Sequence, residues 1–93
     1  LADHDVLVMP TVPHRALPIP EPDAAIEERL APSLEATANT APFNCTGHPA
    51  LSAPCAKRDG LPIGMQLVSR WYGEPALYRV AAALERSGDW ASF

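Results

Sequence analysis

A serine with a nearby histidine is the first arrangement in this sequence that could carry chemistry. Ser52 follows His48 by four positions, and hydrolysis by an activated serine needs a base within hydrogen-bond reach of the hydroxyl. Pro49 keeps the intervening residues out of a helix, and in a strand the two positions would lie about 13 Å apart. The sequence also lacks a Gly-x-Ser-x-Gly nucleophile elbow. We therefore expect a structural serine and a turn histidine, and we assign no catalytic residue within the chain.

A second arrangement, Cys45, His48 and Cys55, has the residue types of a metal site. A structural zinc site usually takes four ligands in two close pairs, whereas this sequence offers one Cys-x-x-His pair and a single further cysteine. Thiols in such a context are more often small buried residues, so we expect no metal. The cysteines are also too few for a disulfide framework, which predicts a reducing, cytoplasmic location.

These side chains lie in or beside a stretch that predicts a bent β-hairpin. Leu51–Cys55 and Ile63–Val68 are apolar runs of strand composition, separated by a polar turn at residues 56–60. Prolines, each of which removes one ladder donor, fall at positions 49, 54 and 62. We expect the first strand to be entered through a tight turn at Thr46–Pro49.

The region before the hairpin predicts a buried strand, a proline-rich loop and a short helix. Val6–Met9 is a continuous apolar run, which is typical of a strand covered on both faces. Such a strand needs more partners than this chain offers, so we expect it to belong to a larger sheet. Prolines then recur over residues 10–22, which predicts an extended loop. A helix is expected at Asp23–Ala31 and ended by Pro32, with at most another turn or two at Ser33–Thr40.

The last third of the chain predicts an amphipathic helix. Apolar residues at i, i+3, i+4 and i+7 form one stripe, comprising Leu77, Val80, Ala81 and Leu84. Pro75 suits the first turn and Gly88 the position just past the end. Trp90 and Phe93 follow, and either docking onto a surface or a frayed end would explain them.

Length and composition restrict the class of protein. The 93 residues allow one small domain, and 47% hydrophobic residues are typical of a globular chain. The net charge is −4, with scattered basic residues, which predicts neither nucleic acid nor an anionic membrane as a direct partner. No apolar run approaches the roughly 20 residues that span a bilayer.

Two motifs, in order and correctly spaced, resemble the C-terminal part of the amidase signature hydrolases. DVLVMPTVPHRA, at 5–16, is similar to the family's strand that ends in Pro-Thr; FNCTGHPALSAPC and GLPIGMQLVSR, at 43–55 and 60–70, look like its C-terminal motif. The matching positions are Asn44, Gly47, Pro49, Ala50, Ser52, Pro54, Cys55, Gly60, Leu61, Pro62, Gly64 and Gln66. The resemblance implies an α/β fold in which residues 1–93 are the C-terminal segment of a single larger amidase domain. This segment would supply the C-terminal portion of a mixed, twisted β-sheet covered by helices.

The resemblance also implies an activity. Enzymes of the family hydrolyse a carboxylic amide to an acid and ammonia by acyl transfer to serine and then to water, without a cofactor. Their two serines and their lysine lie in a Gly/Ser-rich signature in the first half of a longer chain, and no such stretch occurs here. Lys57 is no substitute, because it lies in a polar turn. We therefore expect this chain alone to be inactive, with the remainder of the amidase chain and a small-molecule amide as partners; a homodimer is left open.

The same resemblance predicts the substrate-binding residues. In the family the segment before the Asn-x-x-Gly-x-Pro motif approaches the pocket, where Asn39 and Thr40 would offer hydrogen bonds and Phe43 an apolar wall. Asn44 is expected to hold the following turn. The A subunits of the amidotransferases carry an acid seven positions before this Asn, where the present sequence has Thr37. That difference favours a free-standing amidase that acts on neutral or apolar amides.

Two alternatives stay open. One is the A subunit of a tRNA-dependent amidotransferase, which implies an ammonia tunnel and a companion subunit. The other is a free-standing binding domain that has kept the fold and lost the chemistry. The strand at Val6–Met9, which needs partners outside this chain, argues against the second.

Overall fold

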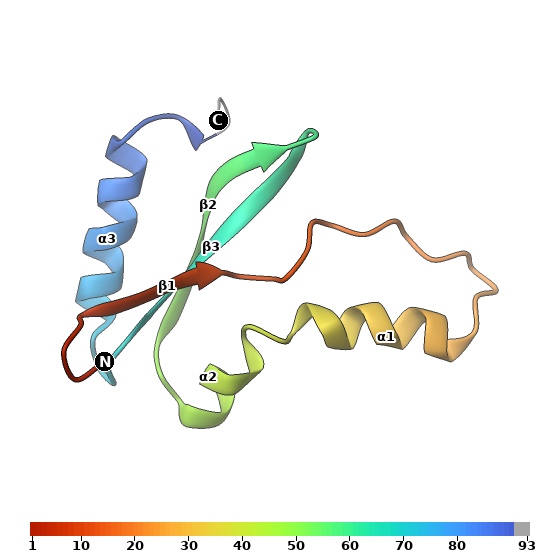
Figure 1. Ribbon diagram of the computed structural model, residues 1–93, viewed down its shortest axis with the longest axis horizontal. Helices are drawn as coiled ribbons and strands as arrows, with labels where there is room; N and C mark the ends of the chain where they lie inside the picture. Colours follow the sequence, from red (N-terminus) through yellow and green to blue (C-terminus); the bar gives the residue numbers. More distant parts are fainter. Residues whose placement is uncertain (91–93) are drawn as a thin grey trace.

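The computed structural model describes residues 1–90 of the chain. In sequence order the elements are β1 (Val6–Pro10), α1 (Ile26–Ala36), α2 (Ala41–Thr46), β2 (Ala50–Arg58), β3 (Leu61–Ser69) and α3 (Glu74–Arg86). Figure 1 shows that residues 12–38, here called the arm, leave the sheet as an extended loop and return through α1. The predicted α/β class is confirmed.

The three strands form an antiparallel sheet in the order β1-β3-β2. β1 pairs along the second half of β3, from Val6 opposite Ser69 to Pro10 opposite Met65. β2 pairs along nearly all of β3, from Ala50 opposite Val68 to Arg58 opposite Leu61. Among the described residues β1 and β2 are both edge strands, and the mixed sheet implied by the resemblance would need further strands.

The predicted bent hairpin is confirmed in β2 and β3, although the turn is shorter than expected. Asp59 and Gly60 form a two-residue turn with φ of 52° and 80°, the positive pair that matches the twist of the flanking strands. Lys57 and Arg58, expected in the turn, pair with β3 instead. The register shifts between Pro54 and Ala56, and this bulge bends the strand.

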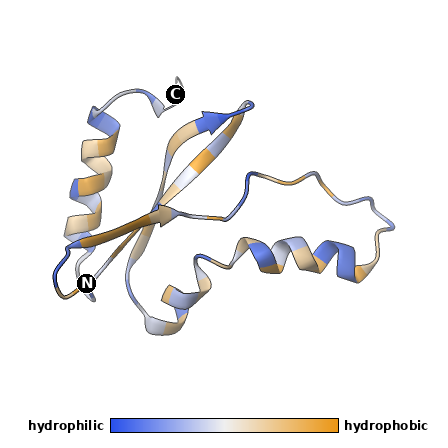
Figure 2. Ribbon diagram, in the orientation of Figure 1, coloured by the Kyte–Doolittle hydropathy of each residue, from blue (hydrophilic) through white to orange (hydrophobic). Residues whose placement is uncertain are grey.

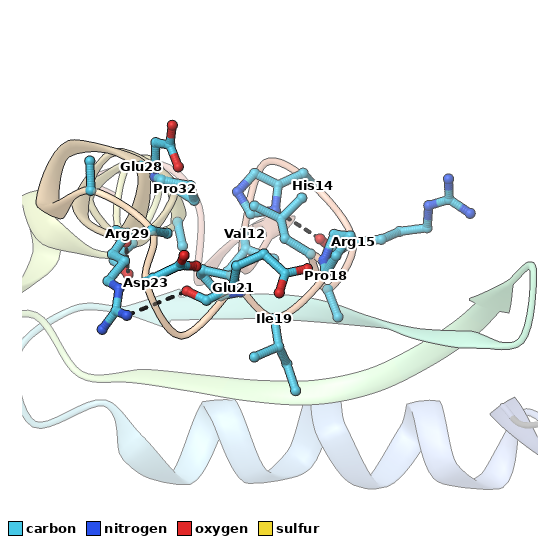
Figure 3. A pocket seen from close by; sticks show the side chains of 17 residues that line it. Val12, His14, Arg15, Pro18, Ile19, Glu21, Asp23, Glu28, Arg29 and Pro32 are labelled. Atoms are coloured by element: carbon cyan, nitrogen blue, oxygen red, sulfur yellow. Dashed lines mark hydrogen bonds between the residues drawn. The ribbon is translucent and has the colours of Figure 1, made fainter.

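The core lies around the second half of β3. The side chains of residues 66–69 are at most 3% exposed, and Leu67 and Val68 are fully buried. Strand alternation places Leu67 on one face and Gln66 and Val68 on the other. Figure 3 shows α3 on one side of the hairpin and the arm on the opposite side. α3 packs on this part of the sheet, and Leu67 and Val68 on opposite faces are both fully buried, so both faces of β3 are covered at this end.

α3 confirms the predicted amphipathic helix. It begins at Glu74 with Pro75 in its first turn, and Leu77 in the apolar stripe is only 2% exposed. Beyond the helix, the Lys57 Nζ of β2 lies over the ring of Trp90, 5.9 Å from its centre. Trp90 is half-buried, and Phe93 falls outside the described residues.

The predicted strand at Val6–Met9 is present as β1, but it is not covered on both faces. Leu7 and Val8 are 37% and 58% exposed. Figure 2 shows that β1 is hydrophobic along its length. Side chains of a strand point to the two faces of its sheet, and within residues 1–90 no helix packs extensively on β1, so these side chains stay exposed.

The helix prediction at Asp23–Ala31 is wrong at both ends. α1 begins at Ile26 and runs through Pro32 to Ala36. Pro32 cannot donate to the carbonyl of Glu28, and water can solvate that carbonyl because no residue of α1 is buried. Thr37 closes the helix by donating its hydroxyl to the carbonyl of Leu34 (2.7 Å). The short helix α2 was not expected from the sequence.

The described chain is flat and extended. Its principal extents are 47 × 34 × 16 Å and its radius of gyration is 15.5 Å, against about 12 Å for a compact domain of this length. The accessible surface of 6675 Å² likewise exceeds the roughly 5200 Å² expected for its mass. No helix within residues 1–90 combines the length and the apolar character that a membrane crossing requires.

Candidate functional site

Asn39 lies at the end of β1, where the arm returns to the sheet. Its side-chain amide donates to the carbonyl of Pro10 (3.0 Å), and its backbone carbonyl accepts from the side-chain amide of Gln66 (2.9 Å). Thr11 donates its backbone N–H to Gly64 of β3 (3.1 Å), so ladder alternation turns the Pro10 carbonyl toward the open edge. These bonds fasten the two ends of the arm to one point, which we call the neck.

Two hydroxyl groups meet beside the neck. Thr11 Oγ1 and Ser52 Oγ lie 2.6 Å apart, although they come from opposite sides of β3. A Cβ added at Gly64 would stand 3.0 Å from Thr11 Oγ1 and 3.1 Å from Ser52 Oγ. The glycine on the central strand therefore leaves the space in which the hydroxyls meet.

His48 and Ser52 do not face each other. The His48 ring stacks on Trp71, with centroids 4.9 Å apart and planes at 11°, and its Nδ1 lies 2.7 Å from Thr46 Oγ1. Trp71 in turn donates its indole N–H to the carbonyl of Thr46 (3.1 Å). His48 thus joins the end of α2 to the connection between β3 and α3.

Thr40 and Phe43 continue from Asn39 into α2, and all three predicted substrate-binding residues are half-buried. Thr40 occupies the N-cap position of α2 and donates its hydroxyl to the carbonyl of Thr37 (3.3 Å). The turn after α2 is held at the carbonyl of Phe43, which accepts from the amide of Gly47 (2.9 Å) and the hydroxyl of Thr46 (3.4 Å). These bonds come from residues other than the predicted turn residue Asn44.

A large open groove of about 1050 Å³ lies elsewhere, between the arm loop and α1. Figure 3 shows its lining, in which Ile19 points away from α1; this side chain is 94% exposed. The one hydroxyl in the lining belongs to Ser33, which donates to the carbonyl of Arg29 (3.2 Å). His14 Nδ1 lies 2.8 Å from the carbonyl of Arg15, and no nucleophile is paired with it in the lining. We interpret this groove as uncovered packing surface.

The residues considered for a metal are dispersed. Cys45 is exposed on α2, and the Cys55 thiol in β2 lies 3.6 Å from the carbonyl of Ile63. Within residues 1–90, no three His, Cys, Asp or Glu side chains gather closely enough to hold an ion.

Comparison with known proteins identifies the family of this chain. The family model described as Amidase matches residues 1–78. The chain belongs to the amidase family. It is 41% identical over 87 residues to an enantioselective amidase of Rhodococcus rhodochrous, covering 94% of this chain and 17% of that protein. It is 42% identical over 90 residues to the A subunit of a glutamyl-tRNA(Gln) amidotransferase from Methanosarcina barkeri, covering 97% and 18%.

A third relative is shorter. It is an uncharacterized protein from the nthA 5′ region of Rhodococcus erythropolis, 41% identical over 86 residues, which cover 92% of this chain and 43% of that protein. The present chain therefore spans less than half the length of each of these relatives.

Sequence reasoning missed the neck and the role of Trp71. Thr11, Gly64 and Gln66 do fall within the two amidase motifs, so the motif positions themselves were the available signal. Their convergence was hidden because Thr11 and Ser52 are 41 positions apart in the chain.

Proposed function

We propose that residues 1–93 are the C-terminal segment of a larger amidase domain that hydrolyses a carboxylic amide to an acid and ammonia. The family match over residues 1–78, in a chain that covers 17% of a full-length amidase, carries the proposal. The open edge of β1 and the exposed helix α1 support it, because they leave faces that further parts of such a domain would cover.

The division of labour follows from the groups that the described residues provide. Ser52 is bonded to Thr11, and His48 is bonded to Thr46, so neither forms a nucleophile and base with the other. The serine that takes up the acyl group would come from the remainder of the domain, where water then releases the acid. This segment would contribute strands to the sheet and, through Asn39, Thr40 and Phe43, one wall of the pocket.

A second candidate function is that of an amidotransferase A subunit. The subunit from Methanosarcina barkeri is as similar to this chain as the amidase is, at 42% against 41% identity. Thr37 favours the free-standing amidase, because this position carries no charge that would suit a substrate amino group. Its hydroxyl is turned back onto α1, where it bonds to the carbonyl of Leu34.

The test combines an intact mass with an ammonia-release assay on the purified protein. We expect a species several times heavier than 10.0 kDa that releases ammonia from neutral amides without a companion subunit. The 93 residues expressed alone serve as the control and should release none. Release from glutamine only after a companion subunit is added would select the amidotransferase.

A third result would exclude both the amidase and the amidotransferase function. A single species of 10.0 kDa that unfolds cooperatively and releases no ammonia would select the free-standing binding domain. The radius of gyration of 15.5 Å, which exceeds that of a compact domain, argues against this result.

Location and assembly are narrower proposals. The cytoplasm is supported by the two cysteines, which are both free. A homodimer is a separate proposal, because the open edge of β1 is already assigned to the rest of the domain. Size-exclusion chromatography with light scattering would decide the assembly, and a monomer mass would contradict the homodimer.

A further inference from the structure

We propose that Gln66 and Asn39 form a positioning pair that holds residues 40–43 at the end of β1 and so selects which amides fit the pocket. The inference rests on the proposed function, because it assumes that residues 40–43 line a pocket for an amide. Neither side chain is given a role in bond making or breaking.

Gln66 is the fixed member of the pair. It lies on the central strand and is 3% exposed, with fully buried Leu67 and Val68 as its next neighbours along β3. Its side-chain N–H donates to the backbone carbonyl of Asn39, 27 positions away in the chain. A buried amide in such a strand has little freedom to follow a moving partner, so it defines where the Asn39 carbonyl lies.

Asn39 links this fixed point on β3 to the end of β1. Its side chain donates to the carbonyl of Pro10, so its peptide is held from β3 and its side chain from β1. Among the described residues, Arg15 of the arm also forms an ion pair with Asp59 of the hairpin, and these side chains are 44% and 74% exposed. An exposed pair of this kind contributes little to stability. The neck bonds therefore hold the returning end of the arm.

The bonds at Asn39 also fix the place of the predicted pocket residues. Thr40 follows Asn39 directly and is the N-cap of α2, and the amide of Phe43 donates to the carbonyl of Thr40 (3.2 Å). A short hydrogen-bonded turn transmits a displacement of its first residue to its last. Because a displacement of about 1 Å can change a rate about 100-fold, loosening the neck should alter the choice among substrates.

The experiment compares Gln66→Met with Ser69→Ala. Methionine keeps the length and apolar body of glutamine but cannot donate to Asn39. Ser69 is the matched control, because it is also on β3, is 1% exposed, and gives up one bond, to the carbonyl of Arg70 (3.0 Å), away from the neck. Both variants lose one side-chain bond from the same strand, but only Gln66→Met frees Asn39.

The first measurement is amide hydrogen exchange in the protein as purified. We expect Gln66→Met to speed exchange over residues 39–44 by about tenfold, and Ser69→Ala to leave this segment unchanged. Gln66→Glu should behave as wild type at low pH, where the protonated carboxyl can donate to Asn39. After it ionises, exchange over residues 39–44 should rise at least as much as in Gln66→Met, because the buried carboxylate faces the Asn39 carbonyl. This recovery at low pH distinguishes the lost donor from a change in packing.

The second measurement is the ratio of kcat/KM for a small and a bulky neutral amide. Gln66→Met should change this ratio about tenfold, and Ser69→Ala should leave it unchanged. Unchanged exchange, or changed exchange with an unchanged ratio, would overturn the inference. If the wild-type protein hydrolyses no amide, the proposed function fails with it, and the exchange data still show separately whether Gln66 holds the segment.

Discussion

At the residue scale, the missing side chain of Gly64 lets two hydroxyl groups meet across the central strand. Thr11 directly follows β1 and Ser52 lies on β2, and their hydroxyls meet only because the central strand leaves room between them. Gln66, two residues further along β3, lies on the same face and reaches Asn39. A glycine and a glutamine of one motif therefore have distinct structural roles, one steric and one polar.

Gly64→Ala should lower the free energy of unfolding by about 1–3 kcal/mol, because the new Cβ forces the hydroxyls of Thr11 and Ser52 apart. Urea titration of the purified protein measures this loss. In a Thr11→Ala background the loss should shrink, since the nearest clashing atom, Thr11 Oγ1 at 3.0 Å, is gone. Strictly additive effects of the two substitutions would contradict this explanation.

Gly47→Val should lower the melting temperature through the turn that follows α2. Gly47 has φ of 76° and caps the helix, and a β-branched residue is strained there by at least about 1–2 kcal/mol. Thermal unfolding followed by circular dichroism measures the change. Gly47→Asn is the matched variant, because asparagine tolerates this conformation, and it should lose less. Equal melting of the valine variant and the wild type would show that the turn does not limit stability.

At the element scale, α1 is a helix with little tertiary packing to stabilise it. None of its residues is buried, Pro32 interrupts its hydrogen bonds, and Leu30 and Leu34 on its surface are 52% and 69% exposed. Helices of this length are marginal in water unless tertiary packing supports them. Figure 2 shows hydrophobic and hydrophilic residues side by side along α1. This mixture is typical of a helix that packs one side against another surface.

Pro32→Ala should increase the helical signal at 222 nm. The substitution restores the bond to the Glu28 carbonyl and removes a ring clash, which together amount to about 3 kcal/mol within a helix. Pro75→Ala is the control, because Pro75 lies in the first turn of α3, where its missing N–H has no partner in the helix. A gain of equal size in both variants would contradict the reasoning.

At the scale of the whole molecule, the shape is that of a part and not of a compact domain. The core is confined to the second half of β3 and the face under α3, whereas the arm extends away from the sheet (Figure 1). Many of the exposed large apolar side chains belong to the arm and to β1, among them Ile19, Leu34 and Val8. This distribution agrees with a chain that spans a small fraction of its relatives.

Leu34→Asp should be nearly neutral in the short form of the protein and destabilising in the long form. In the 93-residue chain Leu34 is 69% exposed, so we expect a change in unfolding free energy within about 0.5 kcal/mol. In the proposed larger domain the same carboxylate would be buried, and we expect a loss of about 2 kcal/mol or more. Urea unfolding of both forms tests this, with the exposed Glu35→Ala as the control. A neutral effect in both forms would mean that this face stays uncovered.

The sequence by itself determined the local elements and the family. Turn residues predicted the hairpin, and the spacing of Leu77, Val80, Ala81 and Leu84 predicted α3, because such signals act between residues a few positions apart. The motif residues gave the amidase resemblance. The same local rules failed at Pro32, where an exposed helix tolerates the lost bond, and at α2, whose start at Ala41–Pro42 carries a weak signal.

Only the tertiary structure decided the neck. Whether Asn39 reaches Pro10, and whether Gln66 reaches Asn39, depends on the path of the arm between residues 12 and 38. Local propensities do not determine that path, because many loop conformations have similar local energies. The exposure of β1 also follows from what lies beside it and not from its own apolar residues. The predicted pocket residues could thus be named from the motif, but the groups that hold them could not.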